Sequence, residues 1–203
     1  MINANADAMG IIFPNNYDKF VPELVSERLM ASIPFASRYR MIDFLLSSMV
    51  GCGIDKIEVL VRENYHSLVD HLGGGREWDL SRKNGGLSIF PPFAQKSIGS
   101  MGGGRVEALA NILPVLKKQK EKYVIMADTN IAANFDFNAL IAQHVKTDAD
   151  ITFAYTKEEL PQELTGAKDA SKGLYYTLKL DGDKVEDLSL IHISEPTRRS
   201  YIS

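Results

Sequence analysis

RYRMIDFLLSSMVGCGIDKIEVLV, residues 38–61, joins a helix pattern to a strand pattern. Its first half carries apolar residues at helical spacing, which predicts an amphipathic helix over residues 38–50. The residues on that face are Ile42, Leu45, Leu46 and Met49. Gly51 and Gly53 mark the end of the helix. Residues 56–61 then form a nearly continuous apolar run, which is typical of a strand buried on both faces of a sheet.

The same alternation of strands and helices extends in both directions along the chain. Further strands are predicted over residues 9–13, 87–90, 123–127 and 149–155. Further helices are predicted over residues 66–72, 105–120 (with a kink or break at Pro114) and 137–145, and a hairpin over 174–190. Apolar strands separated by helices predict an α/β fold with a mostly parallel sheet and helices on both faces. In such sheets ligands bind beyond the carboxyl ends of the strands, which here are loops 14–37, 62–65, 91–104 and 128–136.

The composition is that of an ordinary globular protein. The 203 residues are 45% hydrophobic and 24% charged, with a formal net charge of −3, which argues against a nucleic-acid-binding domain. The single cysteine, Cys52, excludes an internal disulfide. No apolar run approaches the roughly 18 residues of a membrane span. The first ten residues lack the basic and apolar regions of a signal peptide, so a cytoplasmic protein is expected.

Two loops could carry chemistry. Asp128 follows an apolar strand, where a carboxylate can hold Mg²⁺ against a phosphate, or it belongs only to a turn. Gly102, Gly103 and Gly104 precede a helix, whose free amides could bind an anion, or they form a flexible loop. The loop after the first strand contains no glycine between Gly10 and Gly51. A loop that wraps a triphosphate usually needs glycines for close approach of its backbone.

The remaining polar candidates have simpler explanations. The spacing of His66 and His71 does not place them on one helix face, and His144 is expected at a helix rim, so all three are predicted to pack or to face solvent. Cys52 is interpreted as a small packing residue rather than a nucleophile. Asp43 is expected to pair with Arg40 on the helix surface.

Four segments together resemble the glucose-1-phosphate adenylyltransferases, or ADP-glucose pyrophosphorylases. IPFASRYRMIDF (33–44) resembles the family's V-P-F-G-G-K-Y-R-I-I-D-F, and HSL (66–68) resembles its H-S-L. GRVEA (104–108) resembles its G-T-A-D-A, and YVIMAD (123–128) resembles its Y-V-L-I-L-A-G-D. The resemblance covers most of residues 9–156. It implies a Rossmann-like nucleotidyltransferase domain with a role in ADP-glucose synthesis for glycogen, and it implies Mg²⁺ and ATP as the family's cofactor and substrate.

The departures from the family fall on its chemistry. Its first loop, L-A-G-G-x-G-x-R-L, holds nucleotide phosphates, whereas FPNNYDKFVP stands at 13–22 here. Its R-x-K-P-A becomes Arg28-Leu29-Met30-Ala31-Ser32, and a methionine cannot neutralise phosphoryl charge. No catalytic residue is therefore assigned. Arg28, Gly104 and Glu107 are the vestigial candidates for cofactor binding, and Asp128 is the vestigial candidate for metal binding. Arg105 stands where the family has threonine.

Three functions are compatible with these features. The resemblance is greatest to the regulatory, non-catalytic GlgD-type subunit, which implies a catalytic adenylyltransferase subunit as partner in a heterotetramer. The alternatives are an active adenylyltransferase with a divergent phosphate loop and a generic α/β ligand-binding domain. The glycine-free loop separates the first function from the second. The four matching segments separate both from the third.

The end of the chain departs from the family as well. Family members continue beyond this length, so residues 1–188 are expected to form part of a nucleotidyltransferase-like domain in a truncated N-terminal fragment. Residues 189–203 (SLIHISEPTRRSYIS) resemble translated adapter sequence and are expected to be a non-native tail without a place in the core.

Overall fold

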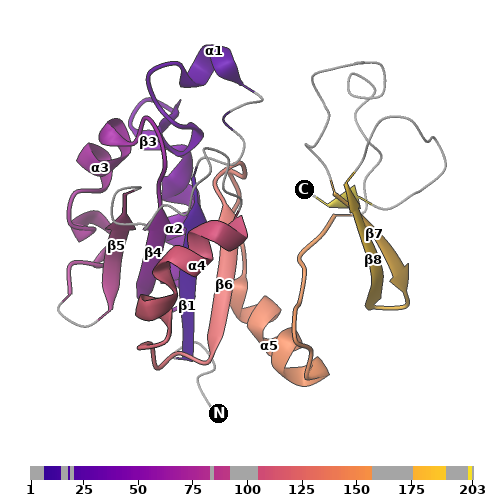
Figure 1. The fold of residues 1–203 in the computed structure, drawn as a ribbon. Helices are drawn as coiled ribbons and strands as arrows, with labels where there is room; N and C mark the ends of the chain where they lie inside the picture. Colours follow the sequence, from indigo (N-terminus) through magenta and orange to yellow (C-terminus); the bar gives the residue numbers. More distant parts are fainter. Residues whose placement is uncertain are drawn as a thin grey trace. The chain divides into compact units, whose positions relative to one another are not determined.

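A computed structural model describes most of the chain. The described residues are 7–14, 18, 21–82, 85–91, 105–156, 176–190 and 201–202. They divide into two compact units, residues 1–146 and 147–203. Figure 1 shows the elements of both units along the chain. The first unit contains β1 (Ala8–Phe13), α1 (Pro22–Val25), η3 (Met30–Ser32), β2 (Pro34–Phe35), β3 (Tyr39–Arg40), α2 (Met41–Gly51), β4 (Lys56–Leu60), α3 (His66–Leu72), η4 (Arg76–Trp78), β5 (Gly86–Phe90), α4 (Arg105–Leu116), β6 (Tyr123–Asp128) and α5 (Phe137–Thr147).

A four-stranded parallel sheet forms the centre of the first unit. Its strand order is β5-β4-β1-β6, and every neighbouring pair is parallel. The register pairs Gly10 of β1 with both Ile57 of β4 and Ile125 of β6. Parallel neighbours need crossover connections, which the helices supply. The predicted α/β class with a mostly parallel sheet is therefore confirmed.

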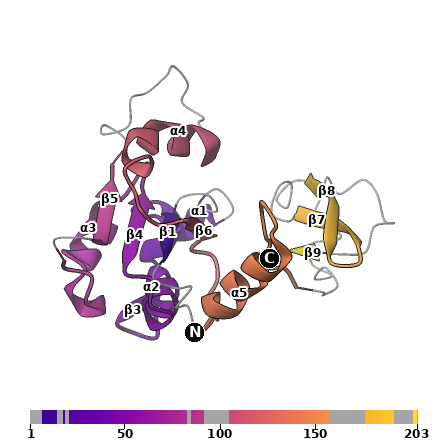
Figure 2. The same cartoon turned by 90° about the horizontal axis from the view of Figure 1, so that it is seen from below.

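Alternate residues of β1 point into two separate hydrophobic cores. Ala8 and Ile12 belong to the larger core, together with buried side chains of α2, α3 and α5. Met9, Ile11 and Phe13 belong to the smaller core beneath α4. Figure 2 shows α4 on one side of the sheet and α2 and α5 on the other. Helices on both faces, as predicted, account for the wholly apolar sequence of β1.

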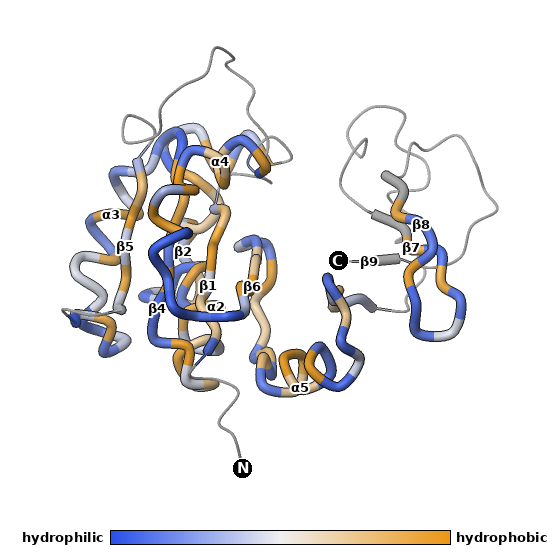
Figure 3. The backbone as a smooth tube through the Cα atoms, turned by 60° about the horizontal axis from the view of Figure 1, so that its bottom comes forward, coloured by the Kyte–Doolittle hydropathy of each residue, from blue (hydrophilic) through white to orange (hydrophobic). Residues whose placement is uncertain are grey.

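The helices bury one stripe each. In α5, Phe137 and Ile141 are buried and four residues apart, which is the spacing of one helix face. Figure 3 shows the resulting alternation of hydrophobic and hydrophilic residues along α5. In the described part of the chain, no helix is both long and apolar enough to cross a membrane.

The helix predicted over residues 38–50 begins later, at Met41. Tyr39 and Arg40 instead pair with Pro34 and Phe35 in a two-stranded antiparallel ribbon, and Ala36 (φ 46°) turns the chain in the left-handed region. The extended Arg40 caps the helix, because its backbone N–H donates to the Asp43 carboxylate.

The helix predicted over residues 105–120 is shorter than expected, ending at Leu116, and Pro114 lies inside it. Proline cannot donate the hydrogen bond that continues a helix. Single turns follow, in which Lys117 donates to the Leu113 carbonyl (2.9 Å) and Gln119 to the Leu116 carbonyl (3.0 Å). The helix therefore passes through Pro114 without a break and ends two residues after it.

The strand predicted over residues 149–155 is wrong. Those residues form no strand in the structure, and Ile151 and Phe153 are 67% and 40% exposed. A strand needs a hydrogen-bonding neighbour, and an alternating sequence does not supply one. The second unit does contain the predicted hairpin, formed by β7 (Tyr176–Asp181) and β8 (Lys184–Leu190), and β9 (Tyr201–Ile202) pairs antiparallel with β7.

Candidate functional site

At the carboxyl edge of the sheet, β1 and β6 end side by side. Phe13, the last residue of β1, pairs in register with Asp128, the last residue of β6. The Asp128 side chain is 16% exposed. The sequence predicts this edge as the place where a ligand would bind, because parallel strands direct their carboxyl ends into one crevice.

An ion pair occupies this edge. Arg105, the first residue of α4, donates from Nη2 to Oδ2 of Asp128. Arg105, which stands at the threonine of the family's G-T-A-D-A segment, therefore contacts the residue that matches the family's metal-binding aspartate. Sequence reasoning identified both positions but not their contact, since they are 23 residues apart and meet only when α4 packs beside β6.

Among the described residues, the donor set at this edge does not fit a divalent cation. Mg²⁺ requires several oxygen ligands in nearly octahedral geometry. Within the described residues, no group of three or more His, Cys, Asp or Glu side chains is arranged to hold a metal ion. Asp128 contributes one carboxylate, and a guanidinium already binds it.

The loop after β1 contains one carboxylate, Asp18, followed in the sequence by Lys19. Asp18 accepts a hydrogen bond through Oδ1 from the backbone N–H of Met30, at 2.7 Å. Met30 begins η3, whose next two residues, Ala31 and Ser32, are buried. A carboxylate thus holds a backbone amide of the segment that replaces the family's R-x-K-P-A. Nothing in the sequence pattern alone indicated this contact.

Neither Arg28 nor Glu107 joins this pair. Arg28 is half-buried in the bend after α1. Glu107 is half-buried on α4, two residues after Arg105, and it therefore lies on a different side of the helix. Gly104 lies outside the described residues.

A polar network at the start of α2 corrects the expectation for Asp43. The side chain is not on the surface but only 11% exposed. Its Oδ2 accepts from the backbone N–H of Arg40 (2.9 Å), and its Oδ1 lies 2.7 Å from Nε2 of His71. The Arg40 side chain turns away to Ser67, donating from Nη1 to its Oγ at 2.7 Å. The network ties α2 to α3, so His71 has a structural partner.

Cys52 and His144 lie as expected. Cys52 is buried in the larger core, with Sγ 3.9 Å from the Phe135 carbonyl oxygen. The His144 ring packs edge-on against Tyr123, with 5.5 Å between ring centroids.

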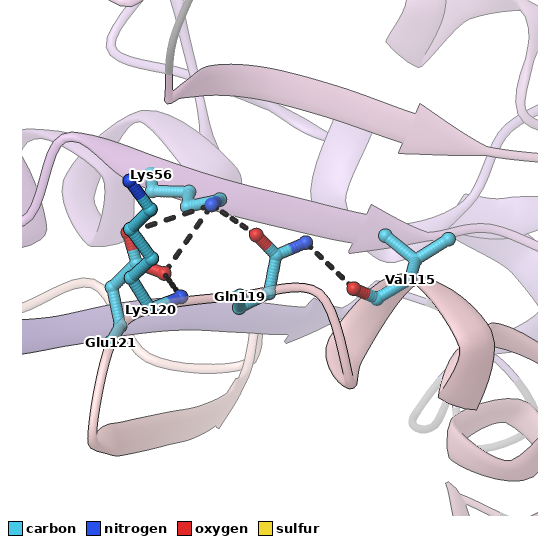
Figure 4. Close-up of polar contacts among 5 residues, drawn as sticks. All are labelled: Lys56, Val115, Gln119, Lys120 and Glu121. Carbon is cyan, nitrogen blue, oxygen red and sulfur yellow. Dashed lines mark hydrogen bonds and ion pairs between the residues drawn. The ribbon is translucent and has the colours of Figure 1, made fainter.

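A second polar cluster fixes the chain between α4 and β6 to β4. Figure 4 shows Lys56 donating to Gln119 and lying against Glu121, whose Oε2 is 3.3 Å from the Lys56 Nζ. Gln119 in turn donates to the Val115 carbonyl at 2.9 Å. These contacts lie at the amino end of β4, away from the carboxyl edge, so they stabilise the fold and do not extend the site.

Glu58 lies on the same face of β4 as Lys56 and is only 3% exposed. Its Oε2 has no hydrogen-bond partner among the described residues. Burial raises the pKa of Glu58, while a hydrogen bond from Ser88 and the charge of Lys56 oppose the rise. The sequence signal for this group is an acidic residue inside an apolar strand.

The buried carboxyl of Glu58 predicts a pH dependence of stability. Because its pKa is higher in the folded than in the unfolded chain, the stability it contributes is present below pH 4.5 and is lost as pH rises through the folded pKa. Glu58→Gln should therefore gain stability relative to the wild type as pH is raised from 4 to 7. Urea unfolding at several pH values measures this, with Glu77→Gln, at an exposed position, as the charge control. A pH-independent difference would contradict the prediction.

Comparisons with known proteins agree on the family. Residues 23–167 match the family model described as nucleotidyl transferase. The chain is 36% identical over 151 residues to the glycogen biosynthesis protein GlgD of Geobacillus stearothermophilus, covering 73% of this chain and 43% of that protein. It is 35% identical over 133 residues to a glucose-1-phosphate adenylyltransferase of Thermomicrobium roseum, covering 64% and 31%. The chain thus spans less than half the length of these curated relatives.

A solved structure has the same fold. It is a putative glucose-1-phosphate thymidylyltransferase from Bacillus anthracis, with a TM-score of 0.65, 13% sequence identity and coverage of 96% of this chain and 68% of that one. At that identity the likeness concerns the fold alone. Taken with the match over residues 23–167, the parallel sheet and its two helical layers show that the chain belongs to the nucleotidyl transferase family.

Proposed function

We propose that this chain is part of a regulatory, non-catalytic subunit of glucose-1-phosphate adenylyltransferase. In this role it modulates the synthesis of ADP-glucose from ATP and glucose 1-phosphate for glycogen, through a catalytic subunit with which it forms a heterotetramer in the cytoplasm. The similarity to two GlgD proteins, at 36% and 33% identity, supports the choice of subunit type.

The observation that carries the proposal is the hydrogen bond from the Met30 amide to Asp18. A nucleotide triphosphate brings several negative charges to the loop after β1, where an enzyme of this kind needs free amides and cations. Here a carboxylate holds the amide of Met30, the same residue that stands at the position of the family's lysine. Coulomb repulsion between Asp18 and a phosphate in this partly buried place opposes binding of the nucleotide in a reactive position.

The alternative is an active adenylyltransferase with a divergent phosphate loop. The position of Asp128 at the end of β6 favours it, because a carboxylate there could face a nucleotide. Its contact with Arg105 removes much of that advantage, since the carboxylate is already charge-paired.

The first experiment measures pyrophosphate release by the 203-residue chain with ATP, glucose 1-phosphate and Mg²⁺. We expect no turnover above that of a heat-inactivated sample. The rate should lie below that of a catalytic subunit by a factor on the order of 10³ or more, because the loss of each charge-stabilising group lowers kcat by a factor on the order of 10²–10³. Turnover that Asp128→Ala abolishes would establish the alternative instead.

The second experiment mixes the full-length parent of this chain with the catalytic subunit from the same organism. We expect a larger assembly by light scattering and a changed affinity for ATP or glucose 1-phosphate, because a subunit without chemistry acts only through differential contact with its partner's states. Unchanged mass and unchanged kinetics would refute the regulatory role.

A further inference from the structure

The ion pair at the carboxyl edge of the sheet places a protein cation at the end of β6. Arg105 contacts Asp128 across the gap between α4 and β6, and their side chains are 37% and 16% exposed. Arg105 belongs to the first turn of α4, and Ile112 of the same helix is buried in the smaller core. The guanidinium is therefore presented by a packed helix and not by a free loop.

The position of Arg105 is unfavourable without its partner. The amino end of a helix carries a partial positive charge, which repels a basic side chain in the first turn and attracts an anion. Asp128 supplies that anion, and it neutralises the guanidinium as well as the helix end. The carboxylate thus receives positive charge from two sources that belong to the protein.

We infer that Arg105 takes the place of a divalent cation as the counter-charge of Asp128, so that the carboxyl edge of this sheet works without metal. A metal ion at the Asp128 oxygens would lie within a few ångströms of the guanidinium and would be repelled by it. This inference rests on the proposed function in one respect: it takes the carboxyl edge as the place where a catalytic member of the family would bind its nucleotide.

The test titrates the 203-residue chain with Mn²⁺ alone and follows free Mn²⁺ by electron paramagnetic resonance. For the wild-type chain and Asp128→Asn we expect superimposable titrations. Arg105→Thr should bind Mn²⁺ about tenfold or more tightly than the wild type, since it removes a positive charge beside the ion. Adding Asp128→Asn to Arg105→Thr should abolish the gain.

Two controls separate the local effect from net charge and from misfolding. Arg82→Thr removes the same charge at the other end of the sheet, where Arg82 pairs with Asp55 at 2.8 Å just before β4, and it should leave the titration unchanged. Arg105→Lys keeps the charge and should bind no more Mn²⁺ than the wild type. If Arg105→Thr does not fold, the wild-type and Asp128→Asn titrations still decide.

Two results would overturn the inference. One is saturable Mn²⁺ binding by the wild type that Asp128→Asn removes, and the other is a folded Arg105→Thr that gains nothing. The Mn²⁺ titration contains no nucleotide and no sugar phosphate, so its result is independent of the pyrophosphate-release assay. Adenylyltransferase activity in that assay would refute the proposed function and would leave the Mn²⁺ result unchanged.

Discussion

Gly86→Ala is expected to lower the free energy of unfolding by about 3 kcal/mol or more, which is at the high end for single substitutions. Gly86 begins β5 with φ 83°, a conformation that residues with a Cβ avoid. A Cβ at this position would lie 2.3 Å from the Leu80 carbonyl oxygen and 3.3 Å from the Arg82 amide nitrogen. Both neighbours are backbone atoms, so a rotamer change cannot relieve the clash.

Urea unfolding followed by the fluorescence of Trp78, the chain's one tryptophan, measures this loss. Gly73→Ala is the matched control, because Gly73 also has a positive φ (49°) but nothing lies within 4 Å of a Cβ built there. It should lose less than Gly86→Ala, because only its backbone conformation (φ 49°, ψ −125°) is strained and no clash is added. Equal losses in the two variants would show that the approach of Leu80 to β5 does not matter.

Asp43→Ala is expected to destabilise the first unit by about 2–3 kcal/mol. The variant removes a helix cap, worth about 1 kcal/mol, and leaves the half-buried partners of the carboxylate without their hydrogen bonds. Those partners are the Arg40 amide and the His71 ring, at 2.9 Å and 2.7 Å. Asp43→Asn retains one acceptor oxygen and should lose less than the alanine variant.

The same unfolding measurement applies to these variants. Asp70→Ala, at an exposed position on α3, is the control, and a change within about 0.5 kcal/mol is expected for such a surface residue. If Asp43→Ala also stays within that range, the carboxylate neither caps α2 nor links it to α3.

The order of elements in the first unit could be predicted from local patterns. The apolar run at 56–61 and the helical spacing in 38–50 each involve residues that are close in sequence. Both patterns arise from which side chains the strand or helix buries. Their boundaries could not be predicted in the same way. Arg40 is extended because of a contact with Asp43, and the competing ribbon, in which Tyr39 pairs with Phe35, takes Tyr39 from the helix.

The candidate site likewise contains one feature that the sequence predicts and contacts that it does not. Asp128 could be placed at the carboxyl end of a strand, since an apolar run that stops at a carboxylate is visible in the sequence. Its contact with Arg105 could not be predicted, and neither could that of Asp18 with Met30. The same holds for residues 149–155, whose alternation looks like a strand but which form none in the structure.

By itself, the sequence determined the α/β class, the parallel sheet with helices on both faces and the family, because hydrophobic periodicity and ordered motifs are local properties of the chain. Only the tertiary structure decided that the carboxylate at the end of β6 faces a guanidinium and that Asp43 is buried against His71. The physical reason is that ion pairs and buried hydrogen bonds depend on distances of a few ångströms between residues far apart in sequence, and packing alone sets those distances.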